Sequence, residues 1–335
     1  MEFYGIEIHN CKDLKWNEET GCYMMCRIPL ELNEKVPGNG FFSSGVELRF
    51  VPIDEEIRIT LKAEKGKVAR PIIYYGSIQS GWQNLFKNVL DVPTEIVIPK
   101  PNNPEFLKKV TEKNNFPFSP EIVRVILPNG QCEIASVQGK CMPPAKEQLP
   151  AKTYLAYGSS ITHGSLAVVQ PNTYVSRIGE AFKADVYNLG FAGLARLEKD
   201  MADYIANECE FDFATLEMGV NILDIPGEEY EHRVRYFVET IAKAHSDKKI
   251  FCIDVFYMSQ DLAGEDTPQC HPRLFREILK RVLEEMNLPN VVYINGLELL
   301  TGSHGLSQDG VHPNARGCEE IAENLTNIIQ ANLNV

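Results

Sequence analysis

A serine, a glycine, an asparagine and an aspartate–histidine pair follow successive apolar runs in the second half of the chain. Ser160 follows the run TYLAYG, and Gly193 follows ADVYNLG. Asn221 follows FDFATLEMG, and a long loop after the last run, NVVYING, carries Asp309 and His312. If these runs are strands of one parallel sheet, the five residues gather at one edge, because sites in such sheets form at the carboxyl ends of the strands.

These residue types fit nucleophilic attack on an ester. A serine hydroxyl is a weak nucleophile until a base removes its proton, and histidine titrates close to neutral pH. Asp309 stands three residues before His312, so both side chains can leave one face of a turn and the carboxylate can orient the imidazole. A backbone N–H beside a glycine and a neutral asparagine amide suit a developing oxyanion. We therefore predict catalytic roles for Ser160, Asp309 and His312, with an oxyanion hole formed by Ser160, Gly193 and Asn221.

Each of these motifs also has a purely structural interpretation. Ser160 could cap the helical turn that follows it, Gly193 could serve a turn, and Asn221 could be an ordinary loop residue. His312 could cap the last helix, since Pro313 suits an early helical position. Separate coincidences of this kind do not account for four strand ends carrying these residues in one order. We favour the catalytic interpretation.

Two regions with different hydrophobic patterns must position these residues. Residues 1–148 hold short apolar or alternating runs rich in valine, isoleucine and tyrosine, without a long helical pattern, which predicts an all-β sandwich or jelly roll. Residues 149–335 alternate strand-like runs with helical patterns, which predicts a parallel sheet covered on both faces. The helices are expected at about 172–182, 197–207, 228–244, 272–286 and 315–333. The proline-rich segment 139–152 is expected to link the two domains.

Composition narrows the class of partner. The 335 residues carry a formal net charge of -13, which argues against nucleic acid and anionic membrane surfaces and favours a neutral small molecule. No apolar run reaches the roughly 18 to 20 residues of a membrane span, and the N-terminus does not resemble a secretory signal. We expect a cytoplasmic protein, and nothing in the composition predicts its oligomeric state.

The cysteines do not indicate a disulfide framework or a metal site. Their number, nine, is odd, and they are scattered along the chain, so reduced and mostly buried thiols are expected. Cys22 and Cys26 have the spacing of a metal half-site, but no matching Cys or His pair follows. The turn GSSITHG lacks the lysine of a phosphate-binding loop. We expect no metal and no organic cofactor.

As a set, the spaced motifs resemble those of the SGNH hydrolases, also called GDSL-like lipases and acylhydrolases. GSSIT aligns Ser160 with the nucleophile of that family, NLGFAG supplies Gly193, GVNI supplies Asn221, and DGVHP supplies Asp309 and His312. The motifs span residues 158–313. The resemblance implies a flavodoxin-like three-layer α/β/α hydrolase domain at 149–335, preceded by the β domain at 1–148.

Two positions depart from the family pattern. Ser159 and Ile222 stand where aspartates are usual in the first and third motifs. The GSSIT form with a β-rich domain in front resembles SGNH esterases that act on acylated sugars or other acylated small molecules. The absence of a long apolar lid argues against long-chain lipids, so a serine esterase releasing a short acyl group, acetyl first, is expected. The alternatives are a carbohydrate-binding protein with a silenced hydrolase domain and an acyltransferase that uses the same site.

Three further residues are candidates for substrate contact. His163 lies three residues beyond Ser160, and His304 lies on the loop before Asp309; both also fit an ordinary loop position. Trp82, in SGWQN, could stack against a sugar or be a buried core aromatic.

Overall fold

The structure, a computed structural model, describes residues 1–36, 39–84 and 87–333. The chain divides into two compact units. The first comprises Met1–Asn33, Gly40–Ala151 and Lys183–Asp185, and the second comprises Glu34–Asn39, Lys152–Phe182 and Val186–Val335. No sequence pattern indicated that Lys183–Asp185, at the start of a strand in the later half, would pack with the first unit.

The first unit contains two antiparallel sheets. One runs in the order β1(Glu2–Phe3), β2(Ile6–His9), β5(Glu47–Pro52), β10(Val123–Ile126), β7(Ile72–Tyr75), β8(Ile78–Gln79), with β12(Cys141–Met142) also paired to β5. The other runs in the order β3(Asp13–Asn17), β4(Cys22–Cys26), β11(Cys132–Gln138), β6(Glu56–Ala63), β9(Thr94–Pro99). β12 and the short 3-10 turn η2(Lys146–Gln148) lie within the segment that was expected to be only a linker.

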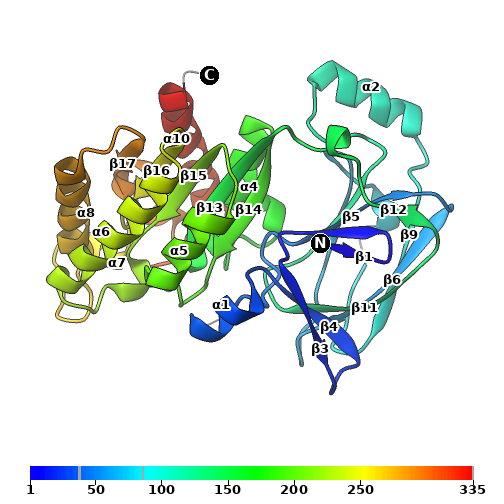
Figure 1. The fold of residues 1–335 in the computed structure, drawn as a ribbon, viewed down its shortest axis with the longest axis horizontal. Coiled ribbons are helices and arrows are strands. Elements are labelled where there is room, and N and C mark those ends of the chain that lie inside the picture. The colour runs from blue at the N-terminus through cyan, green and yellow to red at the C-terminus, as the bar shows by residue number, and fades with distance from the viewer. Residues whose placement is uncertain (37–38, 85–86, 334–335) are drawn as a thin grey trace. The chain divides into compact units, whose positions relative to one another are not determined.

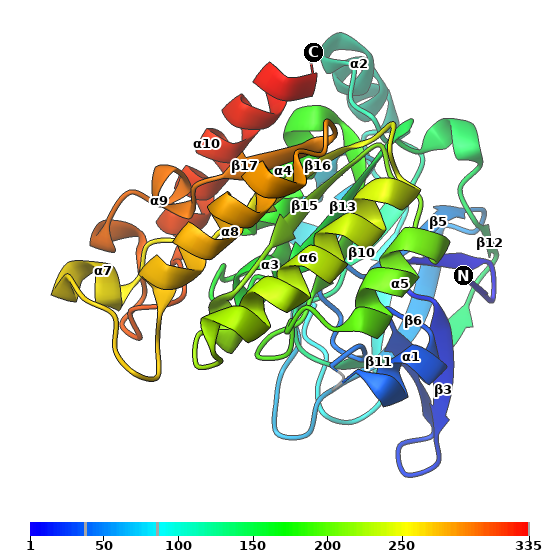
Figure 2. The ribbon, with the colours of Figure 1, turned by 60° about the vertical axis from the view of Figure 1, so that its left-hand side comes forward.

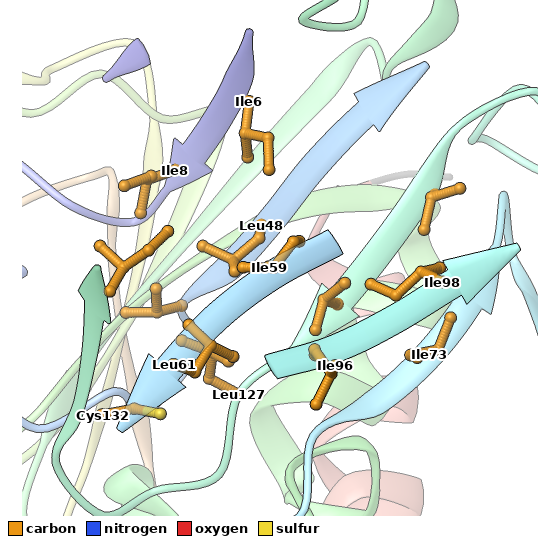
Figure 3. Packing of buried hydrophobic residues seen from close by; sticks show 14 of the residues in the cluster. Ile6, Ile8, Leu48, Ile59, Leu61, Ile73, Ile96, Ile98, Leu127 and Cys132 are labelled. Carbon is orange, nitrogen blue, oxygen red and sulfur yellow. The ribbon is translucent and has the colours of Figure 1, made fainter. Parts of the chain in front are cut away.

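Both sheets contribute side chains to one apolar core. Strand β6 alternates buried and partly exposed residues along its length, as expected for a strand with one face on a core. Figure 3 shows side chains from several strands pointing toward one another, among them Ile59 and Leu61 from β6, Leu48 from β5 and Ile96 from β9. The alternation read from the sequence is therefore the core-facing pattern of this unit.

The sequence analysis did not predict α1(Leu30–Lys35), whose residues are divided between the two units. It also did not predict the 3-10 turn η1(Trp82–Asn84) or α2(Pro104–Asn114), which belong to the first unit. The expectation of no long helix was wrong for α2. Its signals were present, because Pro104 occupies the start and Asn115 ends the helix with a left-handed φ of 50°. They were missed because the helix buries only Leu107 and so contributes little to the apolar pattern of the sequence.

The second unit is built on a sheet in the order β14(Ala184–Gly190), β13(Lys152–Gly158), β15(Phe213–Glu217), β16(Lys249–Ile253), β17(Val291–Ile294), as Figure 1 shows. The pairs from β13 through β17 are parallel. The chain order reverses beside β13, and open parallel sheets bind their ligands at such a point. This confirms the mixed α/β character and the parallel sheet predicted for the second half.

Helices cover both faces of this sheet. Figure 2 shows α5(Lys199–Glu208), α6(Gly227–Ala244) and α8(Pro272–Met286) in front of it, with α4(Tyr174–Phe182) and α10(Ala315–Leu333) behind. The short helices are α3(Ser160–His163), α7(Ser259–Ala263) and α9(Gly296–Leu299), and the 3-10 turns are η3(Gln170–Asn172), η4(Val220–Ile222) and η5(Ser303–Gly305). The predicted helices at 272–286 and 315–333 have the observed bounds. In the part of the chain that the structure describes, no helix is both long and apolar enough to cross a membrane.

A network of buried charges lies in the first unit. The Arg49 side chain is 1% exposed; it donates to both carboxylate oxygens of Asp185, at 2.7 and 2.9 Å, and to Glu47 at 2.8 Å. Arg124 donates to both oxygens of Glu47, at 2.6 and 2.8 Å. Burial alone would raise the pKa of Glu47, but the charges of Arg124 and Arg49 outweigh it and hold that pKa far below its usual range.

Replacing Arg49 tests this network. Arg49→Met should lower the free energy of unfolding by about 3–5 kcal/mol, because it leaves the buried Asp185 carboxylate without its arginine partner. Urea denaturation measures the change. Arg58→Met is the control, since Arg58 pairs with Glu56 and Glu95 on the surface, where solvent screens the charges. Equal shifts of the urea midpoint in both variants would contradict the assignment.

Candidate active site

The serine predicted as nucleophile lies in a tight turn between β13 and α3. Ser159 is the N-cap of α3, and its hydroxyl accepts the N–H of Ile161 at 3.1 Å. The structural alternative for Ser160, a helix cap, is therefore wrong, because its neighbour fills that position. This also explains the departure at Ser159, since serine is a strong N-cap residue, as aspartate is.

The Ser160 hydroxyl meets a histidine from the far end of the chain. His312 Nε2 lies 2.6 Å from Ser160 Oγ, and His312 Nδ1 lies 2.8 Å from Asp309 Oδ2. A carboxylate only accepts, so Nδ1 carries the ring proton and Nε2 is free to accept from the serine. The structure thus joins Ser160, His312 and Asp309 in one continuous chain of hydrogen bonds.

Asp309 is held by the main chain as well as by the imidazole. Its Oδ1 accepts the N–H groups of Val311 and His312, each at 2.9 Å. Burial acts to raise the pKa of Asp309, but these backbone bonds and the bond from the His312 ring lower it below its usual value. The carboxylate is therefore charged at neutral pH and can stabilise a protonated imidazole.

The loop that carries His312 is closed by Asn314. The Asn314 side chain accepts the Gly317 N–H at 3.0 Å at the start of α10, and donates to the Leu306 carbonyl at 2.9 Å. Leu306 also bridges to Pro313 across the loop. The helix-capping alternative for His312 is wrong, because Asn314 caps α10 and leaves the imidazole for Ser160.

Two further groups beside the Ser160 cavity follow β14 and β15, the two strands that flank β13. Gly193 follows β14 with a φ of 75°, and its N–H has no hydrogen-bond partner within the described chain. Nothing lies within 4 Å of a Cβ built there, so the requirement for glycine is conformational. For Asn221, after β15, the assignment of the amide that satisfies its neighbours places the amide oxygen 3.1 Å from the N–H groups of both Leu194 and Ala195. That orientation leaves the amide NH₂ available as a donor.

These groups surround one cavity of about 480 Å³. Its walls include apolar side chains from three loops, Leu166, Val220 and Val311. The full lining consists of Ser160, Ser165, Leu166, Ala192, Gly193, Val220, Asn221, Asp309, Val311 and His312. All five residues of the predicted catalytic and oxyanion sets therefore border the same space.

Two of the three residues predicted to contact substrate, His163 and His304, lie outside the lining of the cavity. His163 is buried in α3, and its Nδ1 lies 3.2 Å from the Gly190 carbonyl, so it supports the fold under the site. The His304 ring pairs with Glu320 of α10 at 3.0 Å. Neither residue lines the cavity. Trp82, in the first unit, is 82% exposed, so its core alternative is wrong and its contact with a sugar stays a prediction.

The sequence analysis missed two residues that anchor the turn of the nucleophile. Asn188, on β14, donates to the Thr162 carbonyl at 2.9 Å and accepts the Gly190 N–H at 2.8 Å. Glu217, at the end of β15, is fully buried and accepts the Ser159 N–H at 2.5 Å. An available signal for Glu217 was a carboxylate inside an otherwise apolar run, FATLEMG.

The second departure from the family pattern has a packing explanation. Ile222 is completely buried on η4, directly after Asn221. An aspartate in that apolar place would need its own hydrogen-bond partners.

As for metals, the described residues hold no group of three or more His, Cys, Asp or Glu side chains suited to an ion.

Comparison with family models identifies the family of this chain. Residues 151–330, just over half of the chain, match the GDSL-like Lipase/Acylhydrolase family, and the chain belongs to that family. A search of the curated proteins finds no match.

Solved structures similar to this chain extend over nearly its whole length. They include a salicylyl-acyltransferase, SsfX3, from a tetracycline biosynthetic pathway, with a TM-score of 0.77 and 18% identity over 98% of this chain and 94% of that one. A putative GDSL-like lipase from Bacteroides ovatus has a TM-score of 0.68 and 18% identity over 98% of both chains. A family two carbohydrate esterase from Cellvibrio japonicus has a TM-score of 0.63 and 12% identity over 98% and 95%. At these identities the similarity concerns the fold.

A methyl group at Gly190 should disturb the site. A Cβ there would lie 2.2 Å from the backbone nitrogen of His163, so Gly190→Ala must displace α3 and with it Ser160. Displacement of about 1 Å can cost on the order of 10²-fold in rate. We expect at least about a tenfold loss of p-nitrophenyl acetate hydrolysis. Gly130→Ala, where nothing lies within 4 Å, is the control, and equal activity in both variants would contradict this steric argument.

Proposed function

We propose that this protein is a serine esterase that removes a short acyl group, acetyl first, from a sugar or another small molecule. The observation that carries the proposal is the hydrogen-bonded series from Ser160 through His312 to Asp309, at 2.6 and 2.8 Å. A silenced binding protein would not need this series intact. The reaction is a two-step acyl transfer, first to the enzyme and then to water.

In the first step, Ser160 Oγ attacks the ester carbonyl carbon while His312 Nε2 takes the hydroxyl proton. The tetrahedral intermediate collapses, the C–O bond to the alcohol breaks, and His312 returns the proton to the leaving alcohol. In the second step, His312 removes a proton from water, which attacks the acyl-enzyme and releases the carboxylic acid. Asp309 holds the Nδ1 proton and stabilises the imidazolium in both steps.

The oxyanion of each intermediate would be bound by the Ser160 N–H, the Gly193 N–H and the Asn221 amide. The left-handed backbone at Gly193 and the two N–H groups that orient Asn221 support this role, because they fix the donors before substrate arrives. Preorganised donors of this kind stabilise developing charge without the cost of reorganising solvent.

The substrate class is inferred from charge and surroundings. The net charge of -13 disfavours anionic polymers and lipid surfaces as partners and favours a neutral ester. The likeness to a solved carbohydrate esterase supports a sugar as the alcohol part. We propose that the first unit is an accessory β-sandwich of the jelly-roll kind, with the exposed Trp82 ring as a sugar contact.

Acyl transfer to another acceptor is the second candidate. It is favoured by the solved salicylyl-acyltransferase, whose fold matches nearly the whole chain with a TM-score of 0.77. The chemistry uses the same acyl-enzyme, and only the group that His312 deprotonates in the second step differs.

Replacing each serine separately tests the assignment. Ser160→Ala should reduce p-nitrophenyl acetate turnover to background, because among the described residues no other hydroxyl is hydrogen-bonded to His312. Ser159→Ala should keep much of the activity and lose about 1 kcal/mol of stability, because it removes only the N-cap of α3. The reverse order of activities would rule out Ser160 as the nucleophile.

Product analysis separates hydrolysis from transfer. Incubation of the enzyme with p-nitrophenyl acetate and a large excess of a sugar or alcohol should still give acetate as the main product if water is the natural acceptor. Chromatography with mass detection measures both products. A predominance of the acylated sugar or alcohol would favour the acyltransferase instead.

A further inference from the structure

A buried carboxyl group lies directly beneath the turn that carries Ser160. Glu217 is the last residue of β15 and is 1% exposed. It does not line the cavity, and the steps described above do not use it. An acidic side chain is seldom fully buried unless it is paired or hydrogen-bonded, so its contacts should explain its presence.

Those contacts go to the residues on either side of Ser160. Glu217 Oε2 accepts the Ser159 N–H at 2.5 Å and the Thr162 hydroxyl at 3.2 Å. Thr162 is in turn 2.7 Å from the Tyr174 hydroxyl at the start of α4. One carboxyl oxygen thus holds the nucleophile turn from below, at the residue before Ser160 and at the second residue after it.

The glycine of the GSSIT motif is required by this contact. A Cβ at Gly158 would lie 2.6 Å from Glu217 Oε2 and 2.2 Å from the Thr162 hydroxyl oxygen. The main chain approaches Glu217 so closely that only glycine fits. Gly158, Ser159 and Glu217 therefore form one packed unit, in which a change of side-chain length at Glu217 must move the main chain next to Ser160.

The bonds of Glu217 indicate that it serves as a hydrogen-bond acceptor for neutral donors and not as the partner of a positive charge. Both donors reach Oε2, whereas Oε1 is buried without a partner among the described residues. These bonds require only one accepting oxygen at this place, which a neutral carboxyl or amide group supplies as well as a carboxylate does. Burial raises the pKa of Glu217 above its usual value, although the hydrogen bonds from Ser159 and Thr162 and the charge of His312 act in the opposite direction.

We propose that Glu217 is a positioning residue of this site, which acts through the Ser159 N–H to keep Ser160 within reach of His312. The inference rests on the proposed function of Ser160 as the nucleophile. On this proposal, the activity depends on the length of the Glu217 side chain and on its accepting oxygen, and it does not depend on a negative charge.

Three substitutions of Glu217 distinguish the effect of side-chain length and of the accepting oxygen from the effect of charge. Glu217→Gln keeps the length and a carbonyl acceptor, so kcat for p-nitrophenyl acetate should stay within about threefold of wild type. Glu217→Asp keeps the carboxyl group but withdraws it by one methylene, and Glu217→Leu removes the acceptor. Both should lower kcat by about tenfold or more, with KM changed less than about threefold, because Ser160 is displaced while the cavity walls remain.

A matched control is available at the end of the next strand. Asp254, directly after β16, is also completely buried and accepts the Gly296 N–H and the Tyr293 hydroxyl, each at 2.6 Å. Burial raises its pKa to about 6. Because Asp254 does not line the cavity, Asp254→Asn and Asp254→Leu should lower the unfolding midpoint but leave kcat within about twofold of wild type.

Several outcomes would overturn the proposal. The first is wild-type kcat in a folded Glu217→Asp or Glu217→Leu variant. The second is a Glu217→Gln variant that is inactive or does not fold. The third is a loss of kcat in the Asp254 variants as large as that in Glu217→Asp and Glu217→Leu. If the Asp and Leu variants do not fold, Thr162→Val decides. It removes one donor to Oε2 and should lower kcat by about two- to fivefold, and unchanged kcat would sink the idea.

The proposed function has a separate failure. If the wild-type protein hydrolyses no ester, or if its activity survives Ser160→Ala, the esterase assignment is wrong. Wild-type activity that depends on Ser160 but does not follow this order of Glu217 variants would overturn only the positioning role.

Discussion

The proposed activity depends on one hydrogen bond, 2.6 Å long, between Ser160 Oγ and His312 Nε2. The two residues are 152 positions apart in the chain. Ser160 follows β13, the first strand of this sheet in chain order, and His312 lies on the long connection between β17 and α10. A displacement of either loop by about 1 Å would break the geometry needed for proton transfer. Much of the local structure around the site serves to prevent such a displacement.

Each partner is held by bonds that do not involve substrate. On the histidine side, the Asp309 carboxylate binds the ring and two backbone N–H groups, and Asn314 closes the loop and caps α10. On the serine side, Ser159 caps α3, while Asn188 and Glu217 reach the turn from β14 and β15. Polar groups buried in this way cost free energy unless their bonds are formed, so the native turn is strongly preferred over alternatives.

The secondary structure of the second unit was largely readable from hydrophobic pattern. Residues Tyr154 to Gly158 are all buried, as a strand covered on both faces requires, and an uninterrupted apolar run encodes this. In the first unit the alternation along β6 was equally clear, whereas α2 was missed because it buries little. Patterns therefore reported the elements that bury much surface and failed for those that lie on it.

The sequence by itself determined which side chains stand at the carboxyl ends of the strands, and so that Ser160, Gly193, Asn221, Asp309 and His312 would border one site. Only the tertiary structure decided that His163 and His304 do not line the cavity and that Glu217 is bonded to the turn of the nucleophile. The reason is physical. The position of a residue along a strand follows from its local hydrophobic period, but the partner of a buried polar group depends on which strands become neighbours. In this sheet β13 lies between β14 and β15, and that order, which no local pattern encodes, brings Asn188 and Glu217 to the turn of Ser160.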